Sequence, residues 1–227
     1  KEILEEFKDQ VPEEVFTTPY ENPVGGDPQK LRANLREALK LFGEAGYKLD
    51  GNRLLDTKTG EQFGFEILLQ SASFERSVLP YVADLKKIGI DARIRTVDTA
   101  QYTNRVRSFD YDMIWVVWAQ GLNPGNEQYN YWGSRSVDIQ GSRNYVGISD
   151  PVIDALIPRI VFAKDRDELI ATTHALDRVL LAHHYVVPLF YSRAVKIAYR
   201  NTIAHPDELP YYGIGFPDAW WSKEAAN

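Results

Sequence analysis

The sequence predicts an α/β fold, a mixed but mostly parallel sheet flanked by helices. Apolar, strand-like runs alternate with segments whose apolar residues recur at helical spacing. Their order is strand, helix, strand, helix, strand, with short links, which is typical of a βαβαβ unit with parallel central strands and right-handed crossovers. A further stretch of about 30 residues, 115–144, opens as a strand and then becomes polar and aromatic. Loops of that length inside a compact domain are usually functional.

The region before the sheet is predicted to hold a lead-in and one helix. Residues 1–27 are interrupted by prolines and by a pair of glycines, so we expect an irregular lead-in that can hold a short helix over 3–8. Asp27 and Pro28 are the residue types of an N-cap and a first helical position, and an apolar stripe follows them. Gly46 is suited to end this helix.

A hairpin and the βαβαβ unit come next. Residues 49–70 predict a hairpin with a short strand about 53–55, a DTKTG turn and a strand over 63–69. The expected elements of the unit are a strand over 63–69, a helix over 74–88, a strand over 90–97, a helix capped by Asp98 or Thr99 that ends near 108, and a strand over 111–118.

Two helices and two strands are predicted after the long stretch. Asp150 and Asp165 are the N-cap residues of helices over 152–162 and 166–183, and strands are expected over 186–191 and 194–199. The tail from Asn201 has no clear period and ends in Trp220 and Trp221. Exposed rings of this kind are a liability, so we expect the tail to pack on another part of the protein.

Composition excludes several classes of protein. The net charge is −6 and the basic residues are scattered, which argues against a nucleic-acid or anionic-membrane partner. No apolar run approaches the roughly 20 residues that span a bilayer. The chain has no cysteine, so disulfides, thiol chemistry and cysteine-ligated metals are excluded. It starts at Lys1, and we expect any signal peptide to lie outside it.

The long stretch combines aromatic rings with neutral amides. Such a combination suits a site that holds a polar organic ligand. The alternative is that the rings pin a long loop onto its own domain. The rings are Trp118, Tyr129, Tyr131, Trp132 and Tyr145, and the amides are Gln120, Asn123, Asn126, Gln128 and Asn130.

The ends of the predicted parallel strands point to the same region. Ligands of open α/β sheets bind beyond the carboxyl ends of the strands. Three segments lie there: 71–76, 98–102 and 119–127. The first is a helix N-terminus that could accept an anion, although Ser73 could equally be a simple helix cap.

Catalytic chemistry is not indicated. The sequence contains no nucleophile elbow, phosphate-binding loop, zinc-binding HExxH or calcium loop. His183 and His184 are adjacent near a helix end and are interpreted as structural. Asp110 and Asp112 lie at a strand start, the wrong end of the sheet for a site. We therefore expect no enzyme, no catalytic residues, no metal and no cofactor.

Several blocks in this order resemble the C-terminal half of the family 5 extracellular solute-binding proteins, the peptide- and nickel-binding proteins of ABC importers. The later blocks are similar to the oligopeptide-binding subgroup of Yej-type importers. The resemblance covers roughly residues 28–200. The blocks are ALKLFGEAGYKL, DLKKIGIDARIRTVD, QYTNRVRSFDYDMIWVVW, NPGNEQYNYWGS, GSRNYVGISDPVIDALI and ALDRVLL…VVPLFY.

The resemblance implies one half of a two-lobed periplasmic protein that closes on its cargo and delivers it to an ABC permease in the inner membrane. Residues 28–191 would be lobe II, a type II periplasmic-binding-protein-like lobe, and 192–227 would return to the N-terminal lobe. That lobe and the signal peptide would lie outside this chain. Family members that bind peptides carry an Asp shortly after the matching tryptophan. The matching position here is Gln120 or a neighbour, and none of these is acidic before Glu127, so Glu127 is a possible substitute anchor for the ligand amine.

The first hypothesis is thus a substrate-binding lobe of an ABC importer for oligopeptides or peptide-like compounds. An oligosaccharide or opine carried by the same fold is the second, and a hydrolase using loop carboxylates is the third. The candidate ligand-binding residues are Ser73, Phe74, Trp118, Gln120, Gly121, Asn123, Glu127, Tyr131 and Trp132.

Overall fold

The computed structural model describes residues 2–189, 194–210 and 213–223. The chain divides into two compact units, Lys1–Tyr185 and Val186–Asn227. The first unit contains a parallel sheet and two hydrophobic cores, and the second contains a short antiparallel ribbon. Within the described ranges, no helix is both long enough and apolar enough to cross a membrane.

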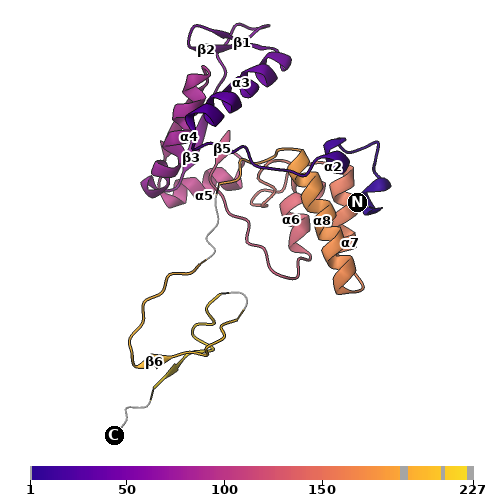
Figure 1. Ribbon diagram of the computed structural model, residues 1–227, viewed down its shortest axis with the longest axis vertical. Helices are drawn as coiled ribbons and strands as arrows, with labels where there is room; N and C mark the ends of the chain where they lie inside the picture. The colour runs from indigo at the N-terminus through magenta and orange to yellow at the C-terminus, as the bar shows by residue number, and fades with distance from the viewer. Residues whose placement is uncertain (1, 190–193, 211–212, 224–227) are drawn as a thin grey trace. The chain divides into compact units, whose positions relative to one another are not determined.

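A three-stranded parallel sheet lies beside α3 (Pro28–Glu44), α4 (Glu75–Lys87) and α5 (Thr99–Arg107) in one part of the first unit (Figure 1). β3 (Gly64–Leu69) lies between β4 (Asp91–Thr96) and β5 (Met113–Ile114), and both neighbours run parallel to it. The last part of β3, Ile67 to Leu69, is at most 2% exposed. A strand buried on both faces carries a continuous apolar run, as β3 does. The predicted α/β class and parallel βαβαβ order are confirmed.

Helices join these strands. Residues 72–74 form a single 3₁₀ turn, η1 (Ala72–Phe74), which leads into α4 (Glu75–Lys87). α5 (Thr99–Arg107) connects β4 to β5, and its N-cap is Asp98, whose carboxylate accepts from the Gln101 N–H at 2.9 Å. Of the two predicted caps, the structure therefore uses Asp98 and not Thr99.

The third strand is much shorter than predicted. The sequence predicted a strand over 111–118, but only Met113 and Ile114 pair with β3. β5 is an edge strand whose only neighbour in the sheet is β3, so the described residues after β5 have no strand with which to form backbone hydrogen bonds. Side chains satisfy the backbone there instead, because Tyr102 Oη donates to the carbonyl of Trp115 at 2.6 Å.

The predicted hairpin uses different strands. β1 (Tyr47–Asp50) pairs antiparallel with β2 (Arg53–Asp56) across a turn in which Gly51 has φ +60°. A two-residue turn of this kind favours a Gly or Asn at positive φ. The predicted pairing of residues 53–55 with 63–69 is wrong, because residues 53–56 pair with β1. In the described ranges, backbone contact with the later run is limited to a bridge between Leu55 and Gln62 and a hydrogen bond from the Phe63 N–H to the Leu54 carbonyl.

The helix before this hairpin agrees with the prediction. α3 (Pro28–Glu44) begins after Asp27, whose side chain accepts from the backbone N–H groups of Gln29 and Lys30. Gly46 follows its C-terminus at φ +92°, the conformation expected of a helix stop. Leu35, Leu39 and Phe42 of α3 pack onto the core of the sheet.

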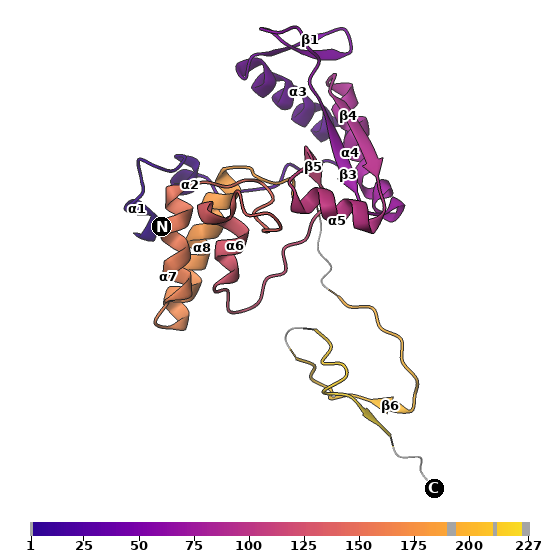
Figure 2. The same cartoon turned by 180° about the vertical axis from the view of Figure 1, so that it is seen from behind.

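A second core lies between α7 (Pro151–Val161) and α8 (Arg166–Ala182), which run side by side in Figures 1 and 2. Asp150 and Asp165 cap these helices as predicted. Two short N-terminal helices join this core. They are α1 (Glu2–Glu5) and α2 (Glu14–Thr17), which bury Leu4 and Val15 against it.

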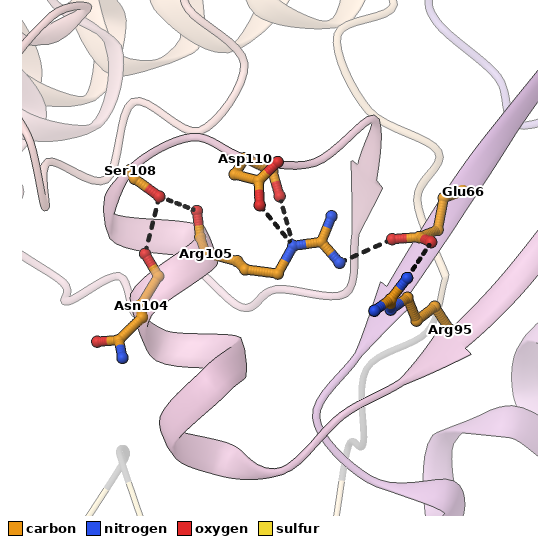
Figure 3. Close-up of polar contacts among 6 residues, drawn as sticks. All are labelled: Glu66, Arg95, Asn104, Arg105, Ser108 and Asp110. Carbon is orange, nitrogen blue, oxygen red and sulfur yellow. Dashed lines mark hydrogen bonds and ion pairs between the residues drawn. The ribbon is translucent and has the colours of Figure 1, made fainter.

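A charged network holds the amino-terminal part of the sheet together (Figure 3). Arg105 of α5 donates to Glu66 of β3 at 2.8 Å and to Asp110 at 2.9 Å. Asp112 accepts from the backbone N–H of Glu66. These contacts give Asp110 and Asp112 structural partners, away from the carboxyl ends of the strands.

The second unit is held by β6 (Ile203–Ala204), β7 (Trp221–Ser222) and an aromatic group. Trp220 lies 5.0 Å from Tyr199 and 4.7 Å from His205 between ring centroids, whereas Trp221 is 53% exposed. The strands predicted over 186–191 and 194–199 do not form in residues 186–189 and 194–199, and residues 190–193 lie outside the described ranges. A strand needs a neighbour to accept its backbone bonds, and the described part of the chain offers none there.

Candidate functional site

The candidate site is the segment 115–145, which continues from the carboxyl end of β5. Two contacts attach its start to the ends of the other elements. Phe74 stacks on Trp115 with ring centroids 5.1 Å apart, and Tyr102 of α5 binds the Trp115 carbonyl. Burial raises the pKa of Tyr102 to about 12, so its hydroxyl keeps the proton that it donates. The carboxyl ends of β3 and β5 therefore meet at Trp115, where a ligand of a parallel sheet is expected.

Trp118 is the centre of an aromatic cluster. Its ring centroid lies 5.0 Å from that of Trp132 and 5.4 Å from that of Tyr145. Its indole Nε1 donates to the carbonyl of Arg143 at 3.0 Å. Trp118 is half-buried, so one part of the ring fixes the loop while another part stays accessible to solvent.

Tyr131 lies deeper than a ligand-contacting ring needs to. It is 6% exposed, and its hydroxyl donates to the carbonyl of Ala119 at 3.1 Å. The guanidinium of Arg143 lies 5.4 Å from the centre of its ring. In this structure Tyr131 pins the loop, as the alternative interpretation of the rings supposes.

Gln128 links Gln120, Glu127 and Trp132 through hydrogen bonds. It is 3% exposed and belongs to α6 (Glu127–Trp132), a short helix inside the segment that was predicted to be irregular. Its Nε2 donates to Gln120 Oε1 at 2.9 Å and to Glu127 Oε1 at 3.0 Å. Its Oε1 accepts from the indole of Trp132 at 2.9 Å. Gln120 is exposed, and the described residues offer its amide nitrogen no hydrogen bond.

Glu127 is ionised near neutral pH. Burial raises the pKa of its carboxyl, but hydrogen bonds from the Gly125 N–H, the Gln128 amide and its own backbone outweigh burial, so the pKa lies below its ordinary value. Oε1 accepts from both Gly125 and Gln128, whereas Oε2 accepts from no other side chain among the described residues. Oε2 can therefore accept from a ligand cation.

Gly121 and Asn123 lie on an exposed part of the segment. Arg166, at the first position of α8, donates to Asn123 Oδ1 at 2.6 Å and to the carbonyl of Leu122 at 2.7 Å. This contact ties the exposed turn to the helical core.

Ser73 and Phe74 belong to η1, the 3₁₀ turn that follows the carboxyl end of β3. Ser71, not Ser73, caps the 3₁₀ turn, because Ser71 Oγ accepts from the Ser73 N–H at 3.2 Å. Ser73 is exposed, and its hydroxyl lies 3.0 Å from that of Ser71. Phe74 reaches the long segment through Trp115, three residues before Trp118.

Two residues of this region were not among the predicted site residues. Asn144 is 1% exposed; its amide donates to the carbonyls of Gly133 and Ile148 and its oxygen accepts from the Ile148 N–H. Arg143 is half-buried and donates to the hydroxyls of Tyr131 and Tyr145. In the sequence they are marked only by the glycine-containing motif GSRN, which does not distinguish a buried amide from an exposed one.

Metal and catalytic groupings are not seen in the described part of the chain. No cluster of three or more His, Cys, Asp or Glu side chains there could hold a metal ion. His183 stacks on Tyr185, and its Nε2 lies 3.3 Å from Asp150 Oδ2 without hydrogen-bond geometry. These groups surround the ends of α7 and α8 and not the long segment.

Solved structures with this fold are periplasmic binding proteins. The oligopeptide-binding protein AppA of Bacillus subtilis, solved with a nonapeptide, matches 98% of this chain and 45% of its own with a TM-score of 0.63 at 18% identity. The mannohexaose-bound periplasmic oligopeptide-binding protein of Thermotoga maritima matches 80% of this chain and 39% of its own, with a TM-score of 0.60 at 18% identity. The fold is therefore shared with part of such proteins.

The sequence comparisons define the family. The model of bacterial extracellular solute-binding proteins, family 5, matches residues 1–139, and the chain belongs to this family. The probable peptide-binding protein YejA of Agrobacterium fabrum is 59% identical over 226 residues, which cover 100% of this chain and 37% of YejA. The peptidoglycan-binding protein YepA of the same species is 37% identical over 219 residues, or 96% of this chain and 35% of YepA. The chain thus spans about a third of the length of these curated relatives.

Proposed function

We propose that this chain is the C-terminal lobe of the substrate-binding component of an ABC importer and that it captures oligopeptides or peptide-like compounds. The observation that carries the proposal is the 59% identity, over the whole chain, to a probable peptide-binding protein of family 5. Within the proposal, residues 28–191 contribute lobe II, and 192–227 return to an N-terminal lobe. The protein works outside the cytoplasmic membrane, in the periplasm, and releases its cargo to a permease without chemical conversion.

The candidate site supports a peptide-like ligand by its residue types. Half-buried rings at Trp118 and Trp132 offer apolar faces, and the Gln120 amide offers a donor. Amphipathic surfaces with a few fixed polar groups bind polar organic molecules with directional hydrogen bonds. Gly121 and Asn123 keep the backbone of the turn exposed beside them.

Glu127 is the proposed anchor for a ligand amine. The resemblance places Gln120 or a neighbour where family members that bind peptides have a carboxylate, and the oxygen of Gln120 already accepts from Gln128. The ionised Glu127, whose Oε2 accepts from no other described side chain, can supply the charge-assisted hydrogen bond that a neutral amide lacks. Ser73 and Phe74, at the end of β3, form the other margin of the proposed site.

Calorimetric titration of the full-length protein tests this function. We expect a mixed pool of alanine peptides to bind and an N-acetylated pool to bind at least about tenfold more weakly, because acetylation removes the ammonium that Glu127 would hold. Glu127→Gln should reduce this contrast, while the matched variant Glu61→Gln, on an exposed turn, should keep it. Absence of binding by both pools would reject the proposal.

A peptidoglycan fragment is the second candidate ligand. The 37% identity to the peptidoglycan-binding protein YepA over 96% of this chain favours it, because such fragments join a short peptide to amino sugars. The exposed parts of tryptophan rings also suit sugar rings. Competition separates the two candidates: displacement of a bound peptide by muropeptides at lower concentration than by peptides of equal length would favour the second.

A further inference from the structure

The side chain of Arg143 is a cation whose protein partners are all uncharged. Nε donates to Tyr145 Oη at 3.2 Å, and Nη1 donates to Tyr131 Oη at 3.2 Å. Nη2 makes only a long contact, 3.5 Å, with the carbonyl of Val117. No ion pair with Arg143 exists among the described residues, whereas Arg93, Arg95, Arg105 and Arg159 each have a carboxylate partner.

The unpaired guanidinium of Arg143 belongs to a half-buried side chain. Withdrawing a charge from water costs free energy unless an opposite charge replaces the solvent. The hydrogen bond from Arg143 to the Tyr145 hydroxyl raises the pKa of the guanidinium, so the side chain remains charged. The guanidinium has more N–H groups than its three oxygen partners use, and its planar fork matches the two oxygens of a carboxylate.

The side chain is held in place by contacts from several parts of the segment. Its guanidinium lies over the Tyr131 ring, its backbone carbonyl accepts from the Trp118 indole, and its backbone N–H donates to Asn130 Oδ1. The neighbouring Asn144 is buried and fully hydrogen-bonded, which fixes the backbone next to it. A cation fixed in this way loses little conformational freedom when it binds an anion.

We propose that Arg143, beside Trp118 and Tyr145, is a specificity-determining residue that binds a carboxylate of the transported ligand. This inference rests on the proposed function, because it assigns one part of the same ligand. The carboxylate can belong to the C-terminus of a peptide or to an acidic side chain, and the chemistry at Arg143 is the same for both.

The test is calorimetric titration of the full-length protein with matched ligands. The first pair is di- to octa-alanine as free acids and as C-terminal amides. The second pair consists of the same amides with one internal glutamate or glutamine. In the wild-type protein, one pair or both should show at least about tenfold tighter binding of the carboxylate form, as a charge-assisted hydrogen bond provides. The pair that shows the contrast identifies the source of the carboxylate.

Arg143→Gln should bring the affinity ratio of that pair close to one. The exposed Arg135, for which the described residues provide no hydrogen bond or ion pair, supplies the matched control, and Arg135→Gln should keep the wild-type ratio. The ratio is compared within each variant, so a loss of stability that weakens both ligands equally cancels. If Arg143→Gln does not fold, Arg143→Lys, which keeps the charge but not the planar fork, must reduce the ratio by at least about threefold.

The results that overturn the inference differ from those that overturn the proposed function. Equal binding of the carboxylate and neutral forms to the wild-type protein, or a ratio that Arg143→Gln leaves unchanged, would refute the role of Arg143 while peptide binding stands. If no alanine peptide in any form binds the wild-type protein, the proposed function fails first, and the inference fails with it.

Discussion

Asn144 gives the most direct prediction about how the long segment is held. We consider Asn144→Asp, which keeps the shape of the side chain but replaces the amide nitrogen with oxygen. The amide donates to the carbonyls of Gly133 and Ile148 at 3.1 and 2.9 Å in a site that is 1% exposed. The variant loses both hydrogen bonds and places a carboxylate oxygen against two carbonyl oxygens.

The magnitude follows from these contacts. A net hydrogen bond contributes about 1 kcal/mol, and each buried group left without a partner costs about 1–3 kcal/mol. We therefore expect Asn144→Asp to lower the free energy of unfolding by about 3–5 kcal/mol at neutral pH. Burial among carbonyls will raise the pKa of the introduced carboxyl, so the protonated form is favoured in the folded state. The loss should therefore become smaller as the pH falls through that raised pKa.

Urea unfolding of the full-length protein, combined with hydrogen exchange at the Ile148 amide, measures this loss. The Ile148 N–H donates to Asn144 Oδ1, so its exchange reports on the site itself. Asn130→Asp is the matched control, because the exposed Asn130 acts only as an acceptor for Arg143 N–H and a carboxylate keeps that role. A loss below about 1 kcal/mol for Asn144→Asp, or one as small as that of the control, would refute the reasoning.

Three further predictions concern packing, pH and binding. Gly89→Ala should lower the free energy of unfolding by about 2–4 kcal/mol in urea unfolding, because φ is +83° and an added Cβ would lie 2.5 Å from Leu54 N, whereas Gly43→Ala in open space should be neutral or stabilising. Because the pKa of Glu127 is lowered in the folded state, its carboxylate stabilises the fold at pH values above the ordinary pKa of a glutamate, and this stabilisation is lost as the pH falls through the folded pKa. In melting curves recorded at decreasing pH, Glu127→Gln should therefore lose less stability than the wild-type protein. Equal losses in the two proteins would contradict this. Trp118→Ala should weaken ligand binding at least about tenfold by calorimetry, and unchanged affinity would move the site elsewhere.

Local signals in the sequence predicted the fold well where a cap or a buried strand was involved. Asp27, Asp150 and Asp165 cap helices as expected, since a carboxylate before an apolar stripe satisfies free N–H groups through nearby atoms alone. The run at β3 is buried on both faces. These features depend on neighbours in the sequence, and a single sequence is sufficient to find them.

Features that depend on distant partners were not predictable in the same way. The length of β5 is set by the single strand beside it, and the apolar run at 113–118 does not reveal that neighbour. β2 pairs with β1 because Gly51 permits the tighter turn, although both alternatives have suitable residues. The burial of Leu4 and Val15 depends on helices more than 130 residues later in the chain.

The candidate site was predicted as a region and not as a set of contacts. The aromatic and amide composition of 115–144 identifies the segment that the structure places at the carboxyl end of β5. Which ring is buried and which is accessible follows from the fold of α6, whose six residues carry no distinct helical stripe. Arg143 has no acidic neighbour in the sequence to mark it, and its unpaired state becomes visible only from its contacts.

The central claim is that the surface of residues 115–145 binds a peptide-like cargo. The most direct measurement is to purify the full-length protein from its native cells, denature it and identify the released small molecules by mass spectrometry. A ligand present at a hundred times its dissociation constant stabilises a protein by about 2.7 kcal/mol, so a tight cargo should persist through purification. We predict peptides or peptidoglycan peptides that carry a free carboxylate, and their loss from the Trp118→Ala variant. Release of neutral oligosaccharides alone, or of the same peptides in equal yield from that variant, would contradict the account.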